Sequence, residues 1–371
     1  MKKIIIEATI HPITSKTFVG DVYIEDGKIK EIGKNLSKEL DLENVEIIQA
    51  EKKHLFPGFI DAHTHLGLYD EGTGWAGNDA NETTDPLTPY IRAIDGVYPL
   101  DKAFEEAVES GVTTVQVMPG SANVIGGVTS VIKTWGKNIE DMIVRHPAAL
   151  KMALGENPKK MHSSDKSITR MGIAGMIRGV FIQEHKKIPN FYNEHIHMAR
   201  NREIPVRIHA HRADDIITAV RLAKEFNLDL RIEHCTEGHL IADELEGLNL
   251  LVSVGPTMTR RSKVELRNKS WQVYRKLIDK GVNISITTDH PYTPIQYLSV
   301  AAAITVREGL TEQEALEAIT INPAKNLGVE NRVGSIEKGK DADLVLWEEH
   351  PFQYTSKVLW TMINGEFVYK K

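Results

Sequence analysis

The stretch Pro57–Gly67 reads PGFIDAHTHLG and holds two histidines that are separated by a single threonine and follow an apolar run. In a β-strand alternate side chains point to the same face, so His63 and His65 share one face with Asp61. Neutral imidazole is a very common metal ligand, and two imidazoles from one strand supply neighbouring positions around an ion. The stretch therefore predicts a strand that ends at a metal site.

The H-x-H pattern is weak by itself, because it also occurs at His195 and His197 in the stretch NEHIHMAR. That stretch has a helical pattern, in which the two rings point about 200° apart. We interpret this second pair as surface histidines, so the prediction of a metal site at His63 and His65 needs support from the rest of the chain.

Eight runs in the middle of the chain have strand character, and helical patterns such as DKAFEEAVESG and WQVYRKLIDKG lie between many of them. In chain order the runs are GFIDAHTH, VTTVQVM, TSVIKTW, AALKMAL, IPVRIHAH, LDLRIEH, NLLVSV and VNISITTD. This alternation is typical of the α/β (β/α)₈ TIM barrel, whose catalytic side chains lie at the carboxyl ends of the strands. The alternative, a doubly wound open sheet, calls for a Gly-rich phosphate-binding turn after the first strand, and the sequence has none there.

Both ends of the chain are rich in short β patterns. Two dipeptides interrupt these patterns, Asp26 with Gly27 and Asn364 with Gly365, and both are typical of two-residue hairpin turns. We therefore expect a small composite β-sandwich domain built from residues 1–56 and 330–371, and a barrel domain over residues 57–329.

The segment from Gly67 to Pro99 has little apolar periodicity and is dense in Gly, Asp, Asn and Thr. A loop of that length inside a compact domain is usually functional. Since it follows the first barrel strand, we expect it to cover the barrel mouth as a lid.

Three later strands also end in side chains that bind metals. The fifth run ends in His209 and His211, the sixth in His234 and the eighth in Asp289. For any one of these residues, a hydrogen-bonded histidine or a capping aspartate is the simpler explanation. Four strand ends together, with the first included, favour a metal site at the barrel mouth.

Lys151 interrupts the apolar fourth run, PAALKMALGEN, and is predicted to face the barrel interior. A buried ammonium without a partner is very costly, so its charge must be compensated or removed. One solution is reaction of the amine with CO₂, which gives a carbamate anion able to bridge two divalent cations. The alternatives are a lysine that reaches solvent at the mouth or one that pairs with Glu156.

The composition excludes several classes of function. Of 371 residues, 41% are hydrophobic and 26% charged, as in globular proteins, and we find no transmembrane segment. The net charge of −6 and the lack of a dense Lys/Arg run argue against a nucleic-acid partner. A lone Cys235 excludes an internal disulfide, and a reducing cytoplasm is the simplest compartment.

The chain resembles the amidohydrolase superfamily, near its imidazolonepropionase-related branch, over almost its whole length. The resemblance rests on PGFIDAHTHLG, the histidines that end the fifth and sixth strands, the aspartate that ends the eighth, and the closing stretch NPAKNLGVENRVGSIEKGKDADLVLW. It implies a distorted (β/α)₈ barrel with a composite β-sandwich. It also implies that a metal-activated hydroxide hydrolyses a C–N bond of a small molecule, in an amide, a peptide-like bond or a cyclic amide.

The resemblance also assigns roles to individual positions. His63 and His65 match the first-strand metal ligands, His234 matches the sixth-strand ligand, and Asp289 matches the last-strand aspartate. Asp289 is then both a ligand and the catalytic base that passes a proton from the nucleophile to the leaving nitrogen.

Two further ligand positions follow from the resemblance. KMALGEN is similar to the carboxylated-lysine strand of isoaspartyl dipeptidases, which puts Lys151 between two divalent ions, with zinc as the first candidate among several metals. Both His209 and His211 fit the fifth-strand ligand, and IHA resembles the imidazolonepropionase pattern, which favours His209.

Two other functions stay open. A mononuclear site of His63, His65, His209 and Asp289 corresponds to an imidazolonepropionase- or deaminase-like hydrolase. Nucleobase deaminases of the superfamily carry a Glu three residues after the fifth-strand His, where this chain has other residues. A non-catalytic barrel scaffold is the second alternative, although such relatives typically lose ligands and this chain keeps them.

The small-molecule substrate itself is the least determined feature. Four polar residues follow barrel strands and are candidates for binding it: His211, Arg212, Arg260 and His290. Arg261 beside Arg260 belongs to the same group, and surface arginines are the alternative explanation for this pair. The family resemblance also makes a homo-oligomer unsurprising.

Overall fold

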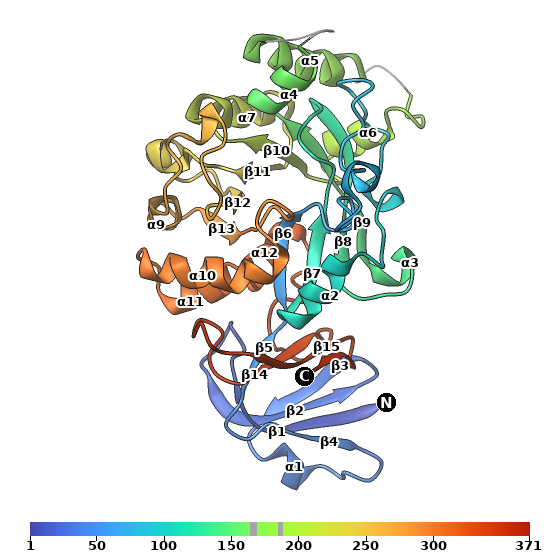
Figure 1. Ribbon diagram of the computed structural model, residues 1–371, viewed down its shortest axis with the longest axis vertical. Coiled ribbons are helices and arrows are strands. Elements are labelled where there is room, and N and C mark those ends of the chain that lie inside the picture. Colours follow the sequence, from blue (N-terminus) through green and yellow to red (C-terminus); the bar gives the residue numbers. More distant parts are fainter. Residues whose placement is uncertain (164–168, 185–187) are drawn as a thin grey trace.

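The computed structural model describes residues 1–163, 169–184 and 188–371. Figure 1 shows two bodies, a barrel surrounded by helices and, below it, a sheet domain that contains both chain ends. The barrel is built from eight strands, and the terminal sheet from eight more. Within the described residues, no helix combines the length and the apolar character that crossing a bilayer requires.

The barrel sheet has its strands in the order of the sequence, from β6 to β13. Its strands are β6 (Phe59–Thr64), β7 (Val112–Val117), β8 (Ile125–Lys133), β9 (Ile143–Ala153), β10 (Val206–Ala210), β11 (Leu230–His234), β12 (Leu251–Val254) and β13 (Asn283–Ile286). Each of the eight predicted runs contributes one strand. Backbone hydrogen bonds from Asp289 N to His63 O (3.2 Å) and from His65 N to His290 O (2.9 Å) connect the first strand to the last.

One strand departs from a regular (β/α)₈ barrel, because β8 runs antiparallel to both β7 and β9. The connection from β7 to β8 covers only residues 118–124, whereas a parallel neighbour needs a crossover of about a dozen residues or more. The expectation of a distorted barrel is confirmed, and a strict alternation of strand and helix at this point would be wrong.

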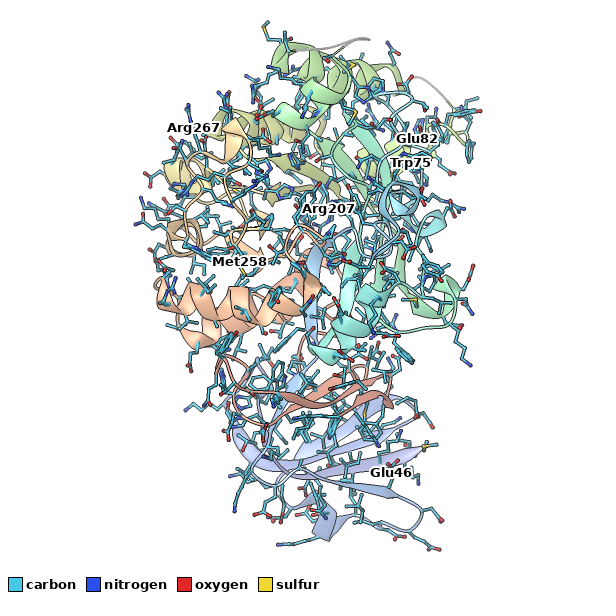
Figure 2. The ribbon with its side chains drawn as sticks, viewed as in Figure 1. Glu46, Trp75, Glu82, Arg207, Met258 and Arg267 are labelled. Atoms are coloured by element: carbon cyan, nitrogen blue, oxygen red, sulfur yellow. The ribbon has the colours of Figure 1, made fainter. Side chains whose placement is uncertain are left out.

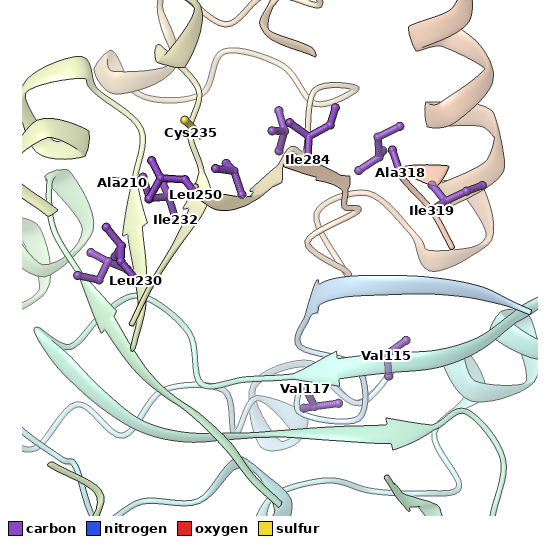
Figure 3. Packing of buried hydrophobic residues seen from close by; sticks show 14 of the residues in the cluster. Val115, Val117, Ala210, Leu230, Ile232, Cys235, Leu250, Ile284, Ala318 and Ile319 are labelled. Atoms are coloured by element: carbon purple, nitrogen blue, oxygen red, sulfur yellow. The ribbon is translucent and has the colours of Figure 1, made fainter. Parts of the chain in front are cut away.

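Helices cover the outside of the barrel (Figure 1). They are α2 (Lys102–Glu109), α3 (Ile139–Met142), α4 (Glu156–Met161), α5 (Arg170–Glu184), α6 (Glu194–Arg200), α7 (Ala213–Phe226), α8 (Ala242–Leu245), α9 (Gln272–Asp279), α10 (Leu298–Arg307), α11 (Glu312–Glu317) and α12 (Ile321–Leu327). Aliphatic side chains of the strands, such as Ile232 and Ile284, pack with Ala318 and Ile319 from the helical layer (Figure 3). Because apolar side chains fill this layer, the opposite face of the strands is left for polar groups.

The terminal domain is one sheet in which a block of strands from the C-terminal end joins a block from the N-terminal end through the pairing of β14 with β5. Its strands are β1 (Lys2–Ile10), β2 (Phe18–Glu25), β3 (Lys28–Gly33), β4 (Glu46–Gln49), β5 (His54–Pro57), β14 (Leu344–Trp347), β15 (Val358–Ile363) and β16 (Glu366–Lys370), with the short helix α1 (Leu36–Glu39). Both predicted hairpins form, and all four turn residues have the positive φ that such turns require, from 50° to 76°.

The two bodies meet at the start of the stretch Pro57–Gly67. Strand β5 ends at Pro57 and β6 begins at Phe59, so the chain passes from the terminal sheet into the barrel within two residues. Buried Lys133 of β8 also reaches across, 3.0 Å from Asp341 and in contact with Asp343. The exact division into residues 1–56 with 330–371 and 57–329 stays a prediction.

Candidate metal centre and active site

The ends of β6 and β13 bring three predicted ligands together. Asp289 Oδ1 lies 3.2 Å from His63 Nε2 and 3.3 Å from His65 Nε2, and all three side chains are buried. The atoms meet because His63 and His65 share one face of β6, while Asp289 follows β13 at the same rim of the barrel. This is the face that period-two alternation predicts.

Hydrogen bonds fix the rings so that one nitrogen of each points to the shared space. His65 Nδ1 donates to Met118 O at 2.7 Å, and His234 Nδ1 donates to Gly255 O at 2.7 Å. A carbonyl oxygen only accepts, so both rings carry their proton on Nδ1 and keep a lone pair on Nε2. That tautomer is the one in which a neutral histidine coordinates a metal through Nε2.

Two groups of candidate ligands form around one shared histidine. His63, His234 and Asp289 offer atoms that lie within 4.8 Å of one another, and His209, His211 and His234 do the same. The structure therefore does not distinguish a ligand from a non-ligand between His209 and His211, because both rings belong to the cluster. His209 lies in β10, and His211 follows its end.

The buried atoms in this space lack partners that a cation would supply. His63 Nε2, Asp289 Oδ1 and both nitrogens of His209 are buried and have no hydrogen-bond partner among the described residues. Lone pairs of His65 and Asp289 face each other at 3.3 Å, which is unfavourable unless a positive charge lies between them. The donor set of imidazoles and a carboxylate therefore fits a divalent transition-metal ion.

Electrostatic effects set the protonation states of the candidate ligands. Burial disfavours the charged form of Asp289, but contacts with His63 and His65 outweigh it and hold the carboxyl pKa well below its usual value. Burial lowers the pKa of His209 well below 6.5, and it lowers the pKa of His234 to about 3. At neutral pH Asp289 is thus a carboxylate, and His209 and His234 are neutral imidazoles. Burial also disfavours the charged form of His63, but its contacts with Glu233 and Asp289 outweigh burial and raise the pKa of that ring.

Lys151 is enclosed beside this cluster. It lies in β9 with 1% of its surface exposed, and its Nζ contacts Met118 Sδ at 3.1 Å. Among the described residues, Lys151 forms no ion pair with Glu156. Because its side chain is buried, the alternative of a lysine that reaches solvent is wrong. Burial lowers the pKa of Lys151 to about 8, with Glu233 and Asp289 opposing the shift.

Sequence reasoning missed the carboxylate behind His63. Glu233 Oε2 accepts from His63 Nδ1 at 2.6 Å, and its other oxygen pairs with Arg207. Arg207 in turn donates to Asn326 Oδ1 at 2.7 Å. All four side chains are buried, so this chain of contacts orients the His63 ring from the inside of the sheet. Glu233 directly precedes His234, and this position was the one available signal.

Asp61 is a second missed residue, although it shares the ligand face of β6. It accepts hydrogen bonds from Thr287 Oγ1 at 2.5 Å and from Thr288 Oγ1 at 2.6 Å. These bonds hold the chain just before Asp289 against β6. Asp61 is therefore a structural support for the ligand positions, and it lies behind them.

The backbone is left-handed at two of the candidate ligands. His234 has a φ of 71° and Asp289 a φ of 53°, a region that residues other than glycine rarely adopt. Such positions cost about 1–3 kcal/mol each and tend to cluster at functional sites. Here both occur where a strand ends and its side chain must turn into the shared space.

A cavity of about 1030 Å³ opens above the cluster, and His65, His209, His211, His234 and Asp289 line its floor. The predicted lid segment contributes Tyr69, Trp75, Asn78, Asn81 and Thr83 to its wall. Loops after β9 and β12 supply much of the rest. The lid expectation is consistent with this lining, and the carboxyl ends of the strands carry the site.

The residues predicted to bind substrate separate into two sets. His211 and Arg260 line the cavity. Arg212 instead pairs with Asp214 at 2.9 Å, and His290 is fully buried with its Nδ1 accepting from Ile295 N, so neither side chain reaches the cavity wall. Arg261 donates to Lys269 O at 2.7 Å and stabilises its own loop.

The second H-x-H pair lies elsewhere, on α6. His197 is partly exposed, but the interpretation of His195 as a surface residue is wrong. His195 is buried, and its Nδ1 contacts Pro89 O at 2.9 Å. The ring holds the 65–101 loop against α6, a contact that local sequence pattern does not reveal.

Residues 54–368 match the family model described as "Amidohydrolase family". This chain is a member of the amidohydrolase family. A solved amidohydrolase from Thermotoga maritima MSB8 is 44% identical, superposes with a TM-score of 0.95, and corresponds to the full length of both chains. The resemblance drawn from the motifs is therefore confirmed, as is the barrel with a separate sheet domain.

Two curated relatives extend the comparison. The amidohydrolase TasK of Hapsidospora irregularis is 28% identical over 94% of this chain, which spans only 40% of that longer protein. The imidazolonepropionase of Thermoplasma volcanium is 24% identical over 94% of this chain and 90% of its own length. The prediction of a hydrolase that acts on C–N bonds is confirmed at this level, and amidohydrolases generally use divalent metal ions.

Proposed function

We propose that this amidohydrolase hydrolyses a C–N bond, of an amide, peptide-like bond or cyclic amide, in a small molecule by a metal-dependent mechanism. The observation that carries the proposal is the convergence of His63, His234 and Asp289 with His209 and His211 around one space at the floor of a cavity. Buried atoms without partners in that space, above all on His209 and Asp289, support a cation there.

The ligands we assign are His63, His65, His209, His234 and Asp289, with His211 in reach of the same cluster. A divalent ion bound by such residues lowers the pKa of water towards neutrality and polarises a carbonyl group. Zinc suits the imidazole and carboxylate donors, and Mn²⁺, Co²⁺ and Fe²⁺ accept them too.

Asp289 is the residue we assign to proton transfer. Its Oδ1 faces the shared space, and its low pKa keeps the carboxylate ionised and able to accept a proton. It takes a proton from the attacking water and delivers it to the leaving nitrogen, so that one carboxylate serves both halves of the reaction.

Lys151 is the candidate for a bridging carbamate and a second metal ion. Burial shifts its pKa to about 8, so about a tenth of the amine is neutral at pH 7, and the neutral amine is the form that reacts with CO₂. The reaction of the neutral amine with CO₂ forms an N–C bond, releases one proton and leaves a carbamate anion. Starting from the ammonium cation, two protons are released in all. A mononuclear centre, in which Lys151 stays an amine, is the competing arrangement.

The proposal is tested by a turnover screen with metal-quantified protein. We expect hydrolysis of members of one class among dipeptides, N-acyl amino acids and cyclic amides, loss of activity after chelation, and recovery on adding a divalent ion. Turnover that survives complete removal of metal would refute the metal-dependent mechanism. Cleavage of linear substrates alone would favour the peptidase-like reaction.

A further inference from the structure

The charge of the cavity wall is opposite to that of the whole chain. The chain carries a net charge of −6, yet the described residues that line the cavity include three cations, Lys160, Arg260 and Lys263, and a single carboxylate, Asp289. Asp289 is a candidate ligand on the floor, so the wall itself is positive. Such a patch on an acidic protein concentrates anions and guides them into the cavity.

Two of the three cations have no carboxylate partner in the part of the chain that the structure describes. Lys263 Nζ lies 2.6 Å from Glu265 Oε1 and donates to Asn157 Oδ1 at 3.0 Å, so its charge is already compensated. Lys160 and Arg260 are exposed, and the structure shows no ion pair for either among the described residues. The Lys263 to Asn157 bond joins α4 to the loop after β12, and these two segments carry Lys160 and Arg260.

The wall also contains an exposed aromatic ring. Trp75 lies in the lid segment, is 93% exposed and lines the cavity, and Met161 at the end of α4, also at the cavity, is 49% exposed. Figure 2 shows Trp75 on the side of β8 and β9. Large apolar side chains exposed at a cavity rim are typical of binding surfaces.

We propose that the substrate is an elongated molecule with two recognition elements: an anionic group bound by Lys160 and Arg260, and an apolar or aromatic group packed against Trp75 and Met161. The inference deepens the proposed function, since it names the class of amide that the site would accept. N-acyl amino acids and short peptides with a free carboxylate belong to this class. The cavity volume of about 1030 Å³ gives room for both elements.

The test uses ligands that contain no C–N bond, so that binding is measured apart from turnover. Calorimetry compares 4-phenylbutyrate with neutral 4-phenylbutanol and with butyrate, which lacks the ring. We expect the metal-loaded wild type to bind 4-phenylbutyrate at least about tenfold more tightly than either analogue. Arg260→Gln and Lys160→Gln should each lose about tenfold affinity for 4-phenylbutyrate and leave phenylbutanol binding unchanged.

Matched variants control for nonspecific effects. Arg267→Gln removes an exposed arginine of the same loop that does not line the cavity, and it should bind 4-phenylbutyrate as the wild type does. Trp75→Ala should weaken 4-phenylbutyrate but not butyrate, whereas Trp135→Ala, far from the lining, should change neither.

The outcomes separate the two proposals. Equal binding of acid and alcohol, or Arg260→Gln and Lys160→Gln variants that behave like Arg267→Gln, would overturn the inference about the anionic group. Binding that is unaffected by Trp75→Ala would overturn the apolar element. If the expected binding pattern holds and no amide is hydrolysed by the metal-loaded enzyme, then the proposed function fails while the ligand class stands.

Discussion

Asp289 combines two demands at one residue, metal binding and proton transfer. Its Oδ1 lies 3.2–3.3 Å from two imidazole nitrogens and has no hydrogen-bond partner among the described residues. Asp289→Asn keeps the shape and one oxygen donor but cannot accept a proton. We expect this variant to retain metal and to lose about 10²-fold or more in kcat. A variant that turns over near the wild-type rate would refute the assignment of Asp289 as the base.

Lys151 tests whether the centre holds two metals. Without the amine no carbamate forms, so Lys151→Ala should lower the metal content per chain. Bicarbonate or a short carboxylic acid such as formate can take the place of the carbamate and restore the metal content. Elemental analysis of the variant with and without formate measures the effect. Two tightly held metals in Lys151→Ala without added acid would rule out the bridge.

At the scale of elements, the pair of strands β10 and β11 holds the ligands from behind. Glu233 of β11 is the shared partner of His63 and of Arg207 in β10. Glu233→Gln keeps the shape but removes the charge, which leaves Arg207 buried without its counter-ion. We expect a loss of about 10–100-fold in metal affinity and of about 3–5 kcal/mol in the free energy of unfolding.

The Glu233→Gln prediction is measured by competitive metal titration and by urea unfolding. Glu237→Gln is the matched control. Glu237 lies after the same strand, and its side chain accepts hydrogen bonds from Asn268 Nδ2 and Ala213 N, neither of which belongs to a candidate ligand. Wild-type metal affinity in Glu233→Gln would show that Glu233 does not orient His63.

Sequence patterns revealed where strands end but not what lies behind those ends. Period-two alternation placed His63 and His65 on one face correctly, because a strand has only two faces. Asp289 lies beyond the end of β13 in a left-handed conformation, and the sequence located only the strand end that it follows. The alternation could not find Glu233 or Arg207, since a charged residue in a strand normally indicates an exposed face, and these two compensate each other inside the sheet. The antiparallel direction of β8 was not predicted either. It depends on the short connection from β7, residues 118–124, and composition alone does not show where that connection begins and ends.

The substrate residues were predicted less well for a related reason. Arg260, Arg261 and Arg212 all follow barrel strands, and nothing local distinguishes them. In the structure Arg261 donates to Lys269 O, and Arg212 pairs with Asp214. Of the three arginines, Arg260 is the one that lines the cavity. Side chains on loops are assigned by tertiary contacts, which no pattern along the chain contains.

At the scale of the whole molecule, a histidine cluster marks the terminal sheet near its junction with the barrel. His11 Nε2 lies 3.0 Å from His54 Nδ1, and the His11 ring stacks on the Phe56 ring. His350 packs edge-on against the Phe56 ring. Burial lowers the pKa of His11 to about 3, with His54 and His350 adding to the shift. The folded protein therefore excludes a proton that the unfolded chain binds below its usual pKa of 6.5.

The sign of the effect follows from that difference in proton binding. Because the folded-state pKa is depressed, stability is fully present above pH 6.5 and declines as the pH falls towards 3. We expect the His11→Gln variant, which cannot titrate, to lose less stability than the wild type between about pH 7 and about pH 5. Thermal unfolding of both proteins at the two pH values measures this, and equal losses would contradict it.

The central claim is that side chains from separate barrel strands bind divalent metal at one rim. The most direct measurement is a titration of chelator-treated protein with Zn²⁺, followed by elemental analysis, for the wild type and for His234→Asn, which removes the histidine shared by both ligand groups. We predict at least one tightly bound ion per chain in the wild type and a clear loss in the variant. A wild type that binds no ion, or a variant that binds as much as the wild type, would contradict the account.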